Sequence, residues 1–437
     1  MGKYFGTDGI RGVVNEGLDF KLAYNVGKSL AYFLIKRKKE QTVIIGQDSR
    51  VSGDMLTSAV ACGLSDYGVS VKLIGIVPTG CVSYLSGKLA VGAGVMITAS
   101  HNEPNMNGIK LINNLGYKFS VKDELEIEKY IELNIVPSKN KGKIITETEL
   151  TNKYINFLTE DVGCSLNGLN IAIDVAYGSN YKIAETVLKK LNANVISIHN
   201  EPLGEKINVD CGALNVNKLI KEVVCHKCDF GFAFDGDADR LIVVANDGRV
   251  LNGDDLLFVL GCYLFNKNKL NSKTVVGTIM TNSGVEESFG EMGINLVRTD
   301  VGDRNVIEAM KENNFVLGGE SSGHICIKSL NGTCDALLNA IYLLKIIITE
   351  KLDLTQFLLK LHKVPQTITN VKVSDEFRRN FDSNLVLCKQ LCKVSKKYQN
   401  MRIIVRPSGT ENVIRIFIEG NPVIAKEVTN EIKKLLM

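Results

Sequence analysis

Three aspartates at alternate positions are the residues whose types and spacing most directly indicate chemistry. The stretch "DFGFAFDGDADR" (229–240) leads an apolar, strand-like segment straight into Asp235, Asp237 and Asp239. In an extended or curved loop, alternate side chains point to one side, so these carboxylates would repel one another unless a divalent cation lay among them. Ligands that are all oxygen favour Mg²⁺ over Zn²⁺. Three solvated carboxylates in an exposed turn are the alternative reading.

An EF-hand calcium loop does not explain this stretch. Such a loop needs glycine at its sixth position and glutamate at its twelfth. Counted from Asp235, those positions hold Arg240 and Asn246. Because Mg²⁺ prefers to keep part of its shell for water or phosphate, the loop predicts a phosphate-bearing partner.

A serine beside a histidine follows a second apolar run. "TASHNEPNMNGIK" (98–110) places Ser100 and His101 directly after residues 91–97, with Lys110 at the end of the same stretch. A serine at a strand end can act as a nucleophile or carry a phosphate, although a turn held by local Ser and Asn hydrogen bonds is the alternative. The glycine-flanked nucleophile elbow is missing.

Two further polar loops could bind a sugar phosphate. In "LGGESSGHICI" (317–327), Glu320 and Ser322 can bind adjacent hydroxyls, and His324 could bind or shuttle protons. In "VRPSGTENVIR" (405–415), guanidinium groups, hydroxyls and backbone N–H groups suit a dianionic phosphate. The residues concerned are Arg406, Ser408, Gly409, Thr410 and Arg415. Taken alone, both loops could equally be ordinary turns.

Alternating strands and helices must position these loops. Strand-like runs at 42–46, 69–76 and 90–98 alternate with a helix at 52–68, and the pattern restarts near 169 and near 274. This alternation predicts the α/β class, with three similar α/β domains built on mixed sheets and a smaller α+β domain at the C-terminus. The expected domain limits are 1–152, 153–253, 254–366 and 367–437. In open α/β sheets, ligands bind at the carboxyl ends of strands.

Composition excludes several classes of protein. The net charge of +4 over 437 residues argues against a nucleic-acid or membrane surface, and no apolar segment is long enough for a signal peptide or a membrane span. The 11 cysteines lack a framework-like spacing, so reduced thiols in a cytoplasmic protein are expected. Cys225 and Cys228 form a C-x-x-C without a second pair at zinc-ribbon spacing, which favours a structural role.

Together the four loops resemble those of the α-D-phosphohexomutase superfamily, in the same order along the chain. "TASHNEPNMNGIK" is similar to its phosphoserine loop, "DGDADR" to its metal loop, "GESSGH" to its sugar loop and "RPSGTE" to its phosphate loop. The stretches 4–12 and 301–310 resemble the bacterial branch that acts on glucosamine phosphates. Ser321 departs from that branch, which usually has glutamine there, and from the mannose and glucose branch, which has methionine.

The resemblance implies a function and a set of roles. It implies four domains around one cleft and conversion of glucosamine 6-phosphate to glucosamine 1-phosphate through a phosphoserine and a bisphosphate, for cell-wall precursors. Ser100 would carry the phosphoryl group, and Mg²⁺ would bind Ser100 and the three aspartates. Arg11 and Arg240 would supply cationic donors. Either His101 or Lys110 could assist proton transfer.

Other readings stay open at this point. A mutase for mannose and glucose phosphates, a metal-dependent phosphatase and a non-catalytic sugar-phosphate sensor would share most of these residues. The expected partner is a small sugar phosphate, with no nucleic acid and no membrane, and a homodimer is left open. Cofactors are Mg²⁺ and a covalent phosphate on Ser100.

Overall fold

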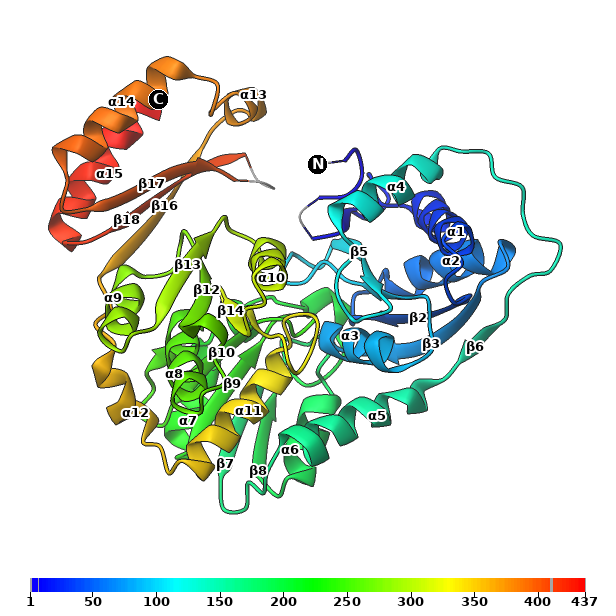
Figure 1. Cartoon of the computed structure of the whole chain (residues 1–437), viewed down its shortest axis with the longest axis horizontal. Helices are drawn as coiled ribbons and strands as arrows, with labels where there is room; N and C mark the ends of the chain where they lie inside the picture. Colours follow the sequence, from blue (N-terminus) through cyan, green and yellow to red (C-terminus); the bar gives the residue numbers. More distant parts are fainter. Residues whose placement is uncertain (1, 7, 409–411, 437) are drawn as a thin grey trace. The chain divides into compact units, whose positions relative to one another are not determined.

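Three mixed sheets and one antiparallel sheet account for the strands of this computed structural model (Figure 1). The structure describes residues 2–6, 8–408 and 412–436. The chain divides into two compact units, one of residues 1–281 and 289–360 and the other of residues 282–288 and 361–437. The first unit holds the three mixed sheets, so three of the four predicted loops lie within it.

The first sheet has the order β1-β5-β4-β2-β3-β6. Its strands are β1 (Ile10–Val13), β2 (Thr42–Gln47), β3 (Ser70–Ile76), β4 (Ala93–Ile97), β5 (Met106–Asn113) and β6 (Ile144–Thr146). β2, β3, β4 and β6 run parallel, β5 is antiparallel to β4, and β1 is antiparallel to β5. β4 is buried along its whole length, as a near-continuous apolar run requires at the centre of a covered sheet.

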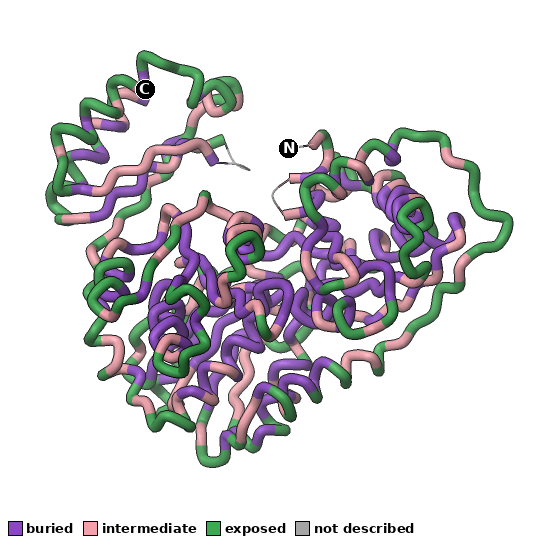
Figure 2. The backbone as a smooth tube through the Cα atoms, viewed as in Figure 1, coloured by how far each residue is buried: buried purple, intermediate pink, exposed green. Residues whose placement is uncertain are grey.

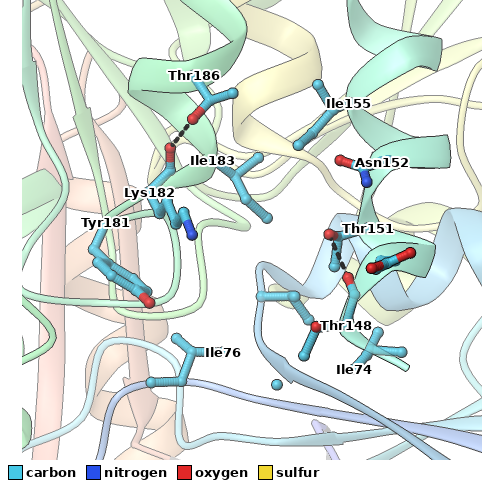
Figure 3. Close-up of a pocket in the computed structure, with 13 residues that line it drawn as sticks. Ile74, Ile76, Thr148, Thr151, Asn152, Ile155, Tyr181, Lys182, Ile183 and Thr186 are labelled. Carbon is cyan, nitrogen blue, oxygen red and sulfur yellow. Dashed lines mark hydrogen bonds between the residues drawn. The ribbon is translucent and has the colours of Figure 1, made fainter. Parts of the chain in front are cut away.

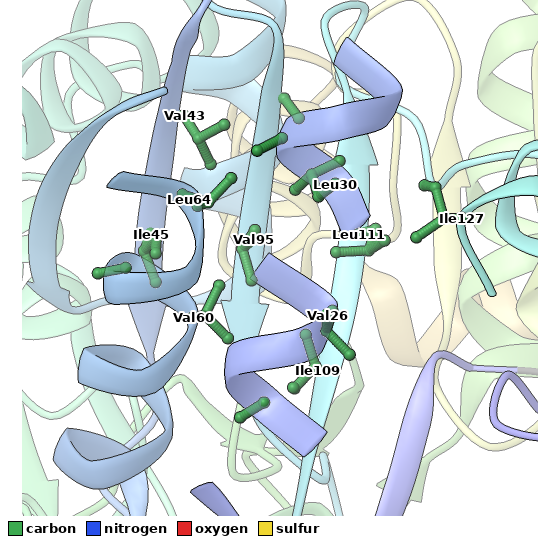
Figure 4. Close-up of a cluster of buried hydrophobic side chains, with 14 of the residues drawn as sticks. Val26, Leu30, Val43, Ile45, Val60, Leu64, Val95, Ile109, Leu111 and Ile127 are labelled. Carbon is green, nitrogen blue, oxygen red and sulfur yellow. The ribbon is translucent and has the colours of Figure 1, made fainter. Parts of the chain in front are cut away.

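Helices cover this sheet and build its core. They are α1 (Phe20–Lys36), α2 (Gly53–Asp66), α3 (Thr79–Lys88) and α4 (Val121–Ile131). The Asp19 side chain accepts a hydrogen bond from Leu22 N at 2.7 Å and so caps the start of α1. Val26 and Leu30 of α1 pack with Val60 of α2 against Val95 of the sheet (Figure 4). The exposed segment 132–143 then leads to β6 (Figure 2).

The second sheet has the order β11-β10-β9-β7-β8. Its strands are β7 (Asn170–Asp174), β8 (Asn194–Ile198), β9 (Phe230–Phe234), β10 (Leu241–Ala245) and β11 (Val250–Leu251). β8, β7 and β9 are parallel, so their carboxyl ends meet at one edge. The associated helices are α5 (Thr151–Asn156), which continues as a π-helical turn over Phe157–Val162, α6 (Ile183–Lys190) and α7 (Asn217–Cys225).

The third sheet has the order β13-β12-β14-β15. Its strands are β12 (Thr274–Thr278), β13 (Asn295–Thr299), β14 (Leu317–Gly319) and β15 (Ile325–Ile327). The accompanying helices are α8 (Gly253–Asn266), α10 (Asp303–Glu312), α11 (Ala336–Thr349) and α12 (Leu354–Phe357). α9 (Ser283–Glu291) begins in the second unit and ends in the first. α11 is the most apolar predicted segment, and nine of its 14 residues are buried. Among the described residues, no helix has the length and apolar character needed to span a bilayer.

The second unit is a small α+β layer. Its antiparallel sheet has the order β16-β18-β17, with β16 (Gln366–Lys372), β17 (Arg402–Pro407) and β18 (Val413–Glu419). The helices are α13 (Asp375–Arg379), α14 (Leu385–Lys397) and α15 (Pro422–Leu436). Val428 and Ile432 of α15 join Ile416 of β18 in its core.

The predicted fold class is confirmed: three α/β/α domains with mixed sheets and an antiparallel C-terminal domain. The predicted strands and helices are all present, although most are shorter than the apolar runs that indicated them. The strand expected over 90–98 spans only Ala93–Ile97, because Val91 and Gly92 precede the ladder with β2.

Candidate active site

Ser100 lies immediately beyond β4 and points at the aspartate loop. Its Oγ donates a 2.8 Å hydrogen bond to Asp235 Oδ2, and its backbone N donates to Thr98 Oγ1 at 2.8 Å. The residue is 1% exposed and adopts φ 52°, the left-handed region that a serine rarely occupies. The structure therefore joins two loops that are far apart in the sequence and holds the serine in a strained backbone conformation.

A buried arginine, which the sequence reasoning missed, holds this loop in place. The Arg50 guanidinium donates to the carbonyl oxygens of Ser100 (2.9 Å), Asn102 (2.8 Å) and Met106 (2.8 Å). Its Nε donates to Asp48 Oδ2 at 3.0 Å, and both side chains are fully buried. Asp48 and Arg50 directly follow β2, the parallel neighbour of β4. In the sequence, the charged pair Asp48 and Arg50 at the end of a strand-like run was the feature that could have indicated this role.

The three predicted aspartates converge between β9 and β10. One oxygen from each carboxylate lies within 4.8 Å of the others, and all three residues are buried. Asp235 Oδ1 accepts the backbone N–H groups of Asp239 (3.2 Å) and Arg240 (3.1 Å), which curls the loop around it. Ala238 takes φ 55° in the same turn. The three aspartates therefore form a buried cluster, and the alternative of an exposed, solvated turn does not apply.

Thr79 and the start of α3 support the second aspartate. Thr79 Oγ1 donates to Asp237 Oδ2 at 2.6 Å, and Thr79 N donates to Asp237 O at 3.0 Å. Asp237 Oδ1 is buried and has no hydrogen-bond partner in the described structure. A buried carboxylate oxygen without a partner is costly in a finished protein, so it marks a position suited to a cation.

Lys110 reaches the same carboxylates from β5. Its Nζ lies 2.7 Å from Asp237 Oδ2, 3.0 Å from Asp239 Oδ2 and 3.1 Å from Asp8 Oδ2. Asp8 also pairs with Arg11, which faces Gly108 across the antiparallel ladder of β1 and β5. Asp8 lies within residues 4–12, a stretch noted only for its resemblance, so its role as an anionic partner was missed.

The pKa values of Asp235, Lys110 and His101 reflect the charges that surround them in this cluster. Burial, with Asp239 and Asp237 nearby, raises the pKa of Asp235 to about 7. Burial alone would lower the pKa of Lys110, but Asp237 and Asp239 outweigh it and hold that pKa well above its usual value. Burial, with Arg240 and Arg11, lowers the pKa of His101 to about 2. Lys110 is thus a cation and His101 a neutral ring.

The sugar-loop residues meet the aspartate loop through His324. Its Nε2 lies 2.9 Å from Asp239 Oδ1 and its Nδ1 lies 3.0 Å from Glu320 Oε2. Burial would lower the pKa of His324, but Asp239 and the Glu320 hydrogen bond outweigh it and raise the pKa to about 10. Ser322 Oγ lies 3.4 Å from Nδ1. Leu241 N donates to Gly323 O at 3.1 Å, so β10 and the sugar loop are joined through the backbone.

Buried ion pairs bind the first α/β domain to the third. Arg304, at the start of α10, donates to both Glu124 oxygens on α4, at 2.5 and 2.6 Å. Lys118 bridges Asp8 and Asp303, with 2.6 Å to Asp303 Oδ2. Gly302 N donates to Glu320 Oε1 at 2.9 Å. The stretch 301–304 therefore helps to position the sugar loop. This contact was not predicted from the sequence.

The predicted phosphate loop belongs to the second unit. Arg406 of β17 and Arg415 of β18 are cross-strand partners, and Ser408 N donates to Val413 O at 2.9 Å. This hairpin brings the two guanidinium groups to one stretch of the ladder. Gly409 and Thr410 lie outside the described residues.

A cavity of about 400 Å³ in the first unit contains none of the predicted site residues (Figure 3). Ile74 and Ile76 line it together with Thr151, Tyr181 and Lys182. The dashed hydrogen bonds in the figure, from Thr151 to Thr148 O (2.7 Å) and from Thr186 to Lys182 O (2.8 Å), stay within its walls. The chemistry concentrates instead at the ends of β4 and β9.

Comparison with known families identifies the class. The chain matches, in order, the phosphoglucomutase/phosphomannomutase models for alpha/beta/alpha domain I (2–135), domain II (152–248), domain III (252–364) and the C-terminal domain (369–435). The chain therefore belongs to the α-D-phosphohexomutase superfamily, as the serine, aspartate and sugar loops also indicate.

Curated relatives narrow the class to one activity. A phosphoglucosamine mutase from Alkaliphilus metalliredigens is 40% identical over 438 residues, covering 98% of this chain and 97% of that protein. Another from Finegoldia magna is 37% identical over 443 residues, covering 100% and 98%. Within the superfamily the chain groups with the phosphoglucosamine mutases, which are isomerases.

Solved structures share the fold. A phosphoglucomutase/phosphomannomutase family protein from Burkholderia thailandensis superposes with a TM-score of 0.82 at 21% identity, covering 99% of this chain and 96% of that one. An Aspergillus fumigatus N-acetylphosphoglucosamine mutase, solved with GlcNAc-6P and magnesium, gives 0.69 at 15% identity, covering 99% and 96%. At these identities the likeness is one of fold alone.

Proposed function

We propose that this chain interconverts glucosamine 6-phosphate and glucosamine 1-phosphate by passing a phosphoryl group through Ser100. The observation that carries the proposal is the 2.8 Å contact between Ser100 Oγ and Asp235, since it joins the nucleophile of one domain to the carboxylate cluster of the next. Phosphoryl transfer depends mainly on such positioning and on charge neutralisation.

The group transfer balances as two half-reactions. With phosphate on Ser100, a free sugar hydroxyl forms a bond to phosphorus, the bond from phosphorus to Ser100 Oγ breaks, and the hydroxyl proton ends on the departing Ser100 Oγ. The sugar then carries two phosphates. After the bisphosphate reorients in the site, Ser100 Oγ forms a bond to the phosphorus of the other phosphate. The bond from that phosphorus to the sugar oxygen breaks, the serine proton ends on that oxygen, and the isomeric sugar phosphate is released. No external oxidant or co-reactant is consumed.

Lys110 and His101 support different parts of this step. Asp237 and Asp239 raise the pKa of Lys110 against the effect of burial, so Lys110 supplies positive charge beside the serine loop. Neutral His101 has Nδ1 at 3.5 Å from Ser100 Oγ, which suits an orienting contact with the hydroxyl. Arg11 and Arg240 add fixed positive charge close to His101. We assign proton transfer to neither His101 nor Lys110 alone.

Mg²⁺ fits the donor set of the aspartate cluster. The ligands are all oxygen, and Asp237 Oδ1 has no hydrogen-bond partner among the described residues. Burial and the neighbouring Asp239 and Asp237 raise the pKa of Asp235 to about 7, which indicates uncompensated negative charge. Asp235, Asp237, Asp239 and a phosphoserine oxygen at Ser100 would hold the ion. Bound there, Mg²⁺ would supply charge neutralisation during transfer.

The remaining predicted residues complete the proposal. Glu320 and Ser322 would form hydrogen bonds with sugar hydroxyl groups. Protonated His324 would hold Glu320 and Asp239 in position. Arg406, Ser408 and Arg415, with Gly409 and Thr410, would bind the phosphate that is not reacting. We also keep the domain limits 1–152, 153–253, 254–366 and 367–437, and a homodimer, as predictions.

The covalent step can be tested on Ser100. Peptide mass spectrometry of purified protein should find a phosphate on Ser100 in part of the sample. Ser100→Ala should reduce mutase turnover by orders of magnitude because the covalent route is lost. An active Ser100→Ala enzyme without any phosphoserine in the parent protein would exclude the mechanism. Phosphate release without an isomerised sugar product would instead indicate a phosphatase.

The sugar can be tested by competition. Glucosamine 6-phosphate should give a higher kcat/KM than mannose 6-phosphate or glucose 6-phosphate. Some activity on glucose 6-phosphate is expected, because Ser321 matches the residue of neither sugar branch. The measurement is a comparison of the three substrates at one enzyme concentration. Mannose 6-phosphate as the best substrate would contradict the assignment while leaving the superfamily unchanged.

The metal can be tested by removal. EDTA should abolish turnover, and Mg²⁺ should restore it. Asp237→Asn should raise the Mg²⁺ concentration needed for half-maximal turnover by roughly tenfold or more. Asp247→Asn, an exposed carboxylate in the turn after β10 that pairs with Arg249, is the matched control and should change nothing. Equal effects of the two substitutions would contradict the site.

A further inference from the structure

A second group of metal-ligating side chains lies at the same edge of the second sheet. Asp174 ends β7, and His199 directly follows β8, its parallel neighbour. Cys211 lies in the segment that leads from β8 toward α7. One donor atom from each of the three residues lies within 4.8 Å of the others. The sheet order places this group on the β8 side of β7, opposite the aspartate loop that follows β9 (Figure 1).

The three side chains are buried and already held close together. Asp174 and Cys211 are 0% exposed, and the His199 side chain is 7% exposed. Asp174 Oδ1 accepts Ala176 N at 3.0 Å and lies 3.0 Å from His199 Nδ1, while Oδ2 accepts Gly212 N at 2.9 Å. An ionised carboxylate has about four acceptor positions, so Asp174 retains capacity for one more partner.

Several residues around this group take the left-handed backbone conformation. Five residues other than glycine take left-handed φ values between 49° and 63° on the segments that carry it. They are Ala176, Tyr177, His199, Asn208 and Asp210. Such conformations persist where the surrounding structure over-determines them, and they concentrate at ligand-binding sites. A cross-link among three separate segments would provide that constraint.

We propose that Asp174, His199 and Cys211 form a binding site for Zn²⁺, separate from the oxygen-only aspartate cluster. One thiolate, one imidazole and one carboxylate make the mixed donor set that zinc prefers over Mg²⁺, with a fourth position left for water. On binding, Cys211 releases its thiol proton to solvent, since the thiolate is the ligand.

His199 changes tautomer in this step. In the structure Nδ1 faces the Asp174 carboxylate and Nε2 lies 3.3 Å from Lys218 Nζ, so the ring proton belongs on Nδ1. An ion bound between Asp174 and His199 takes the Nδ1 lone pair, and the ring proton moves to Nε2. The Lys218 side chain is exposed and turns away from that new N–H.

The site would act on the serine loop through one asparagine. Asn208 lies between His199 and Cys211 in the chain, and its Nδ2 donates to the backbone carbonyls of Ser100 (2.9 Å) and Asn102 (3.3 Å). Gly212 packs so closely that a Cβ there would lie 2.3 Å from Phe234 O, immediately before Asp235. Zinc would therefore anchor the segment whose Asn208 shares the carbonyl oxygens of Ser100 and Asn102 with Arg50.

Cobalt titration of the full-length protein tests the proposal without reference to activity. After chelator treatment, Co²⁺ should produce a thiolate-to-cobalt absorption band in the near ultraviolet that saturates at about one equivalent per chain. Cys211→Ser should abolish the band. His199→Asn should weaken Co²⁺ affinity by roughly tenfold or more, because asparagine tolerates the left-handed backbone but its amide is a poorer ligand.

Two controls separate this site from its competitors. Cys225→Ser, in the exposed part of the C-x-x-C pair, and Asp237→Asn, in the oxygen-only cluster, should both keep the band. If Cys211→Ser does not fold by circular dichroism, X-ray absorption of the zinc-loaded parent protein decides instead, with one sulfur at about 2.3 Å expected.

Several results would overturn the site: no band in the parent protein, a band that survives Cys211→Ser, a band lost with Cys225→Ser, or a zinc shell of oxygen and nitrogen only. Each of these is independent of Mg²⁺-dependent turnover. Failure of the zinc site is thus distinguishable from failure of the proposed mutase mechanism.

Discussion

At the scale of single residues, the serine loop depends on a side chain that never reaches the reacting atoms. Arg50 donates to four carbonyl oxygens of the turn, those of Ser100, Asn102, Glu103 and Met106, and its planar fork of donors suits that task in a way that a lysine does not. The left-handed Ser100 is thereby held with Oγ toward Asp235. Arg50 is a positioning residue, and its removal should affect both stability and turnover.

Arg50→Lys should lower the free energy of unfolding by at least about 3 kcal/mol, since two or more hydrogen bonds from a charged donor are lost at about 1.5–3 kcal/mol each. Turnover should fall by roughly tenfold or more with little change in KM, because Ser100 is misplaced. Urea unfolding and steady-state kinetics measure the two effects.

The matched control for this experiment is Arg249→Lys. Arg249 pairs with Asp247 at 2.7 Å, but both side chains are nearly half exposed, so the change should stay within about 0.5 kcal/mol. If the two lysine variants lost the same stability and activity, the hydrogen bonds from Arg50 to the serine loop would have no special role.

A different residue-scale finding concerns Gly80, the second residue of α3. A Cβ at Gly80 would lie 2.3 Å from the Asp335 carboxyl, and Asp335 also accepts hydrogen bonds from Tyr154 OH at 2.8 and 2.9 Å. Asp335 caps α11, and the next residue, Ala336, donates its N–H to Ala238 O in the aspartate loop at 3.1 Å. Glycine at this position therefore leaves room for the cap of a helix that contacts the metal loop.

At the scale of elements, α1 and α2 cross at two glycines. A Cβ on Gly27 would lie 2.2 Å from Val60 O, and a Cβ on Gly63 would lie 2.1 Å from Tyr24 O. The close approach lets Val26, Leu30 and Val60 pack together on the first sheet (Figure 4). Because both clashing atoms are backbone atoms, neither can move without displacing a helix.

Gly63→Ala should accordingly destabilise the protein by about 1–3 kcal/mol, the usual cost of overpacking, although alanine is the better helix former. Gly290→Ala in α9 is the control, since a Cβ there meets nothing within 4 Å, and it should stabilise by about 0.4–1 kcal/mol. Thermal unfolding of both variants measures the difference. A stabilising Gly63→Ala would show that the helices separate more easily than their packing indicates.

At the scale of the whole molecule, buried ion pairs join the first α/β domain to the third. The pair between Glu124 and Arg304 is bidentate, and its side chains are 3% and 10% exposed. The adjacent Gly302 bonds Glu320 of the sugar loop. The distance between the serine loop and the sugar loop is therefore set partly by charges that lie outside both.

Glu124→Gln should lower the free energy of unfolding by about 3 kcal/mol, because it leaves the buried Arg304 guanidinium without its counter-charge. Glu126→Gln, on the same helix, breaks a pair with the exposed Arg37 and should cost less than about 1 kcal/mol. Chemical denaturation of the two variants provides the comparison. Equal losses would mean that the domain contact does not rely on this pair.

Much of the fold followed from local patterns. The apolar runs at 42–46, 69–76 and 90–98 became β2, β3 and β4. β2 and β4 are buried along nearly their whole length, and burial on both faces of a parallel strand requires a continuous apolar stretch. Asp235, Asp237 and Asp239 were identifiable because their spacing and the strand before them lie within twelve residues of sequence. Ser100 was identifiable for the same reason, with its resemblance to the phosphoserine loop as the stronger support.

The sequence by itself determined the fold class, the strand ends that carry polar loops and the superfamily. Only the tertiary structure decided which side chains share one site. The 2.8 Å contact from Ser100 to Asp235 spans 135 residues, and the pairs of Arg304 with Glu124 and of Lys118 with Asp303 span 180 and 185. Such contacts have no local periodicity, because they arise from domain packing and not from the geometry of one helix or strand. The surroundings of Lys110 were decided in the same way, because the three carboxylates around its Nζ, those of Asp8, Asp237 and Asp239, come from two loops that are distant in the sequence.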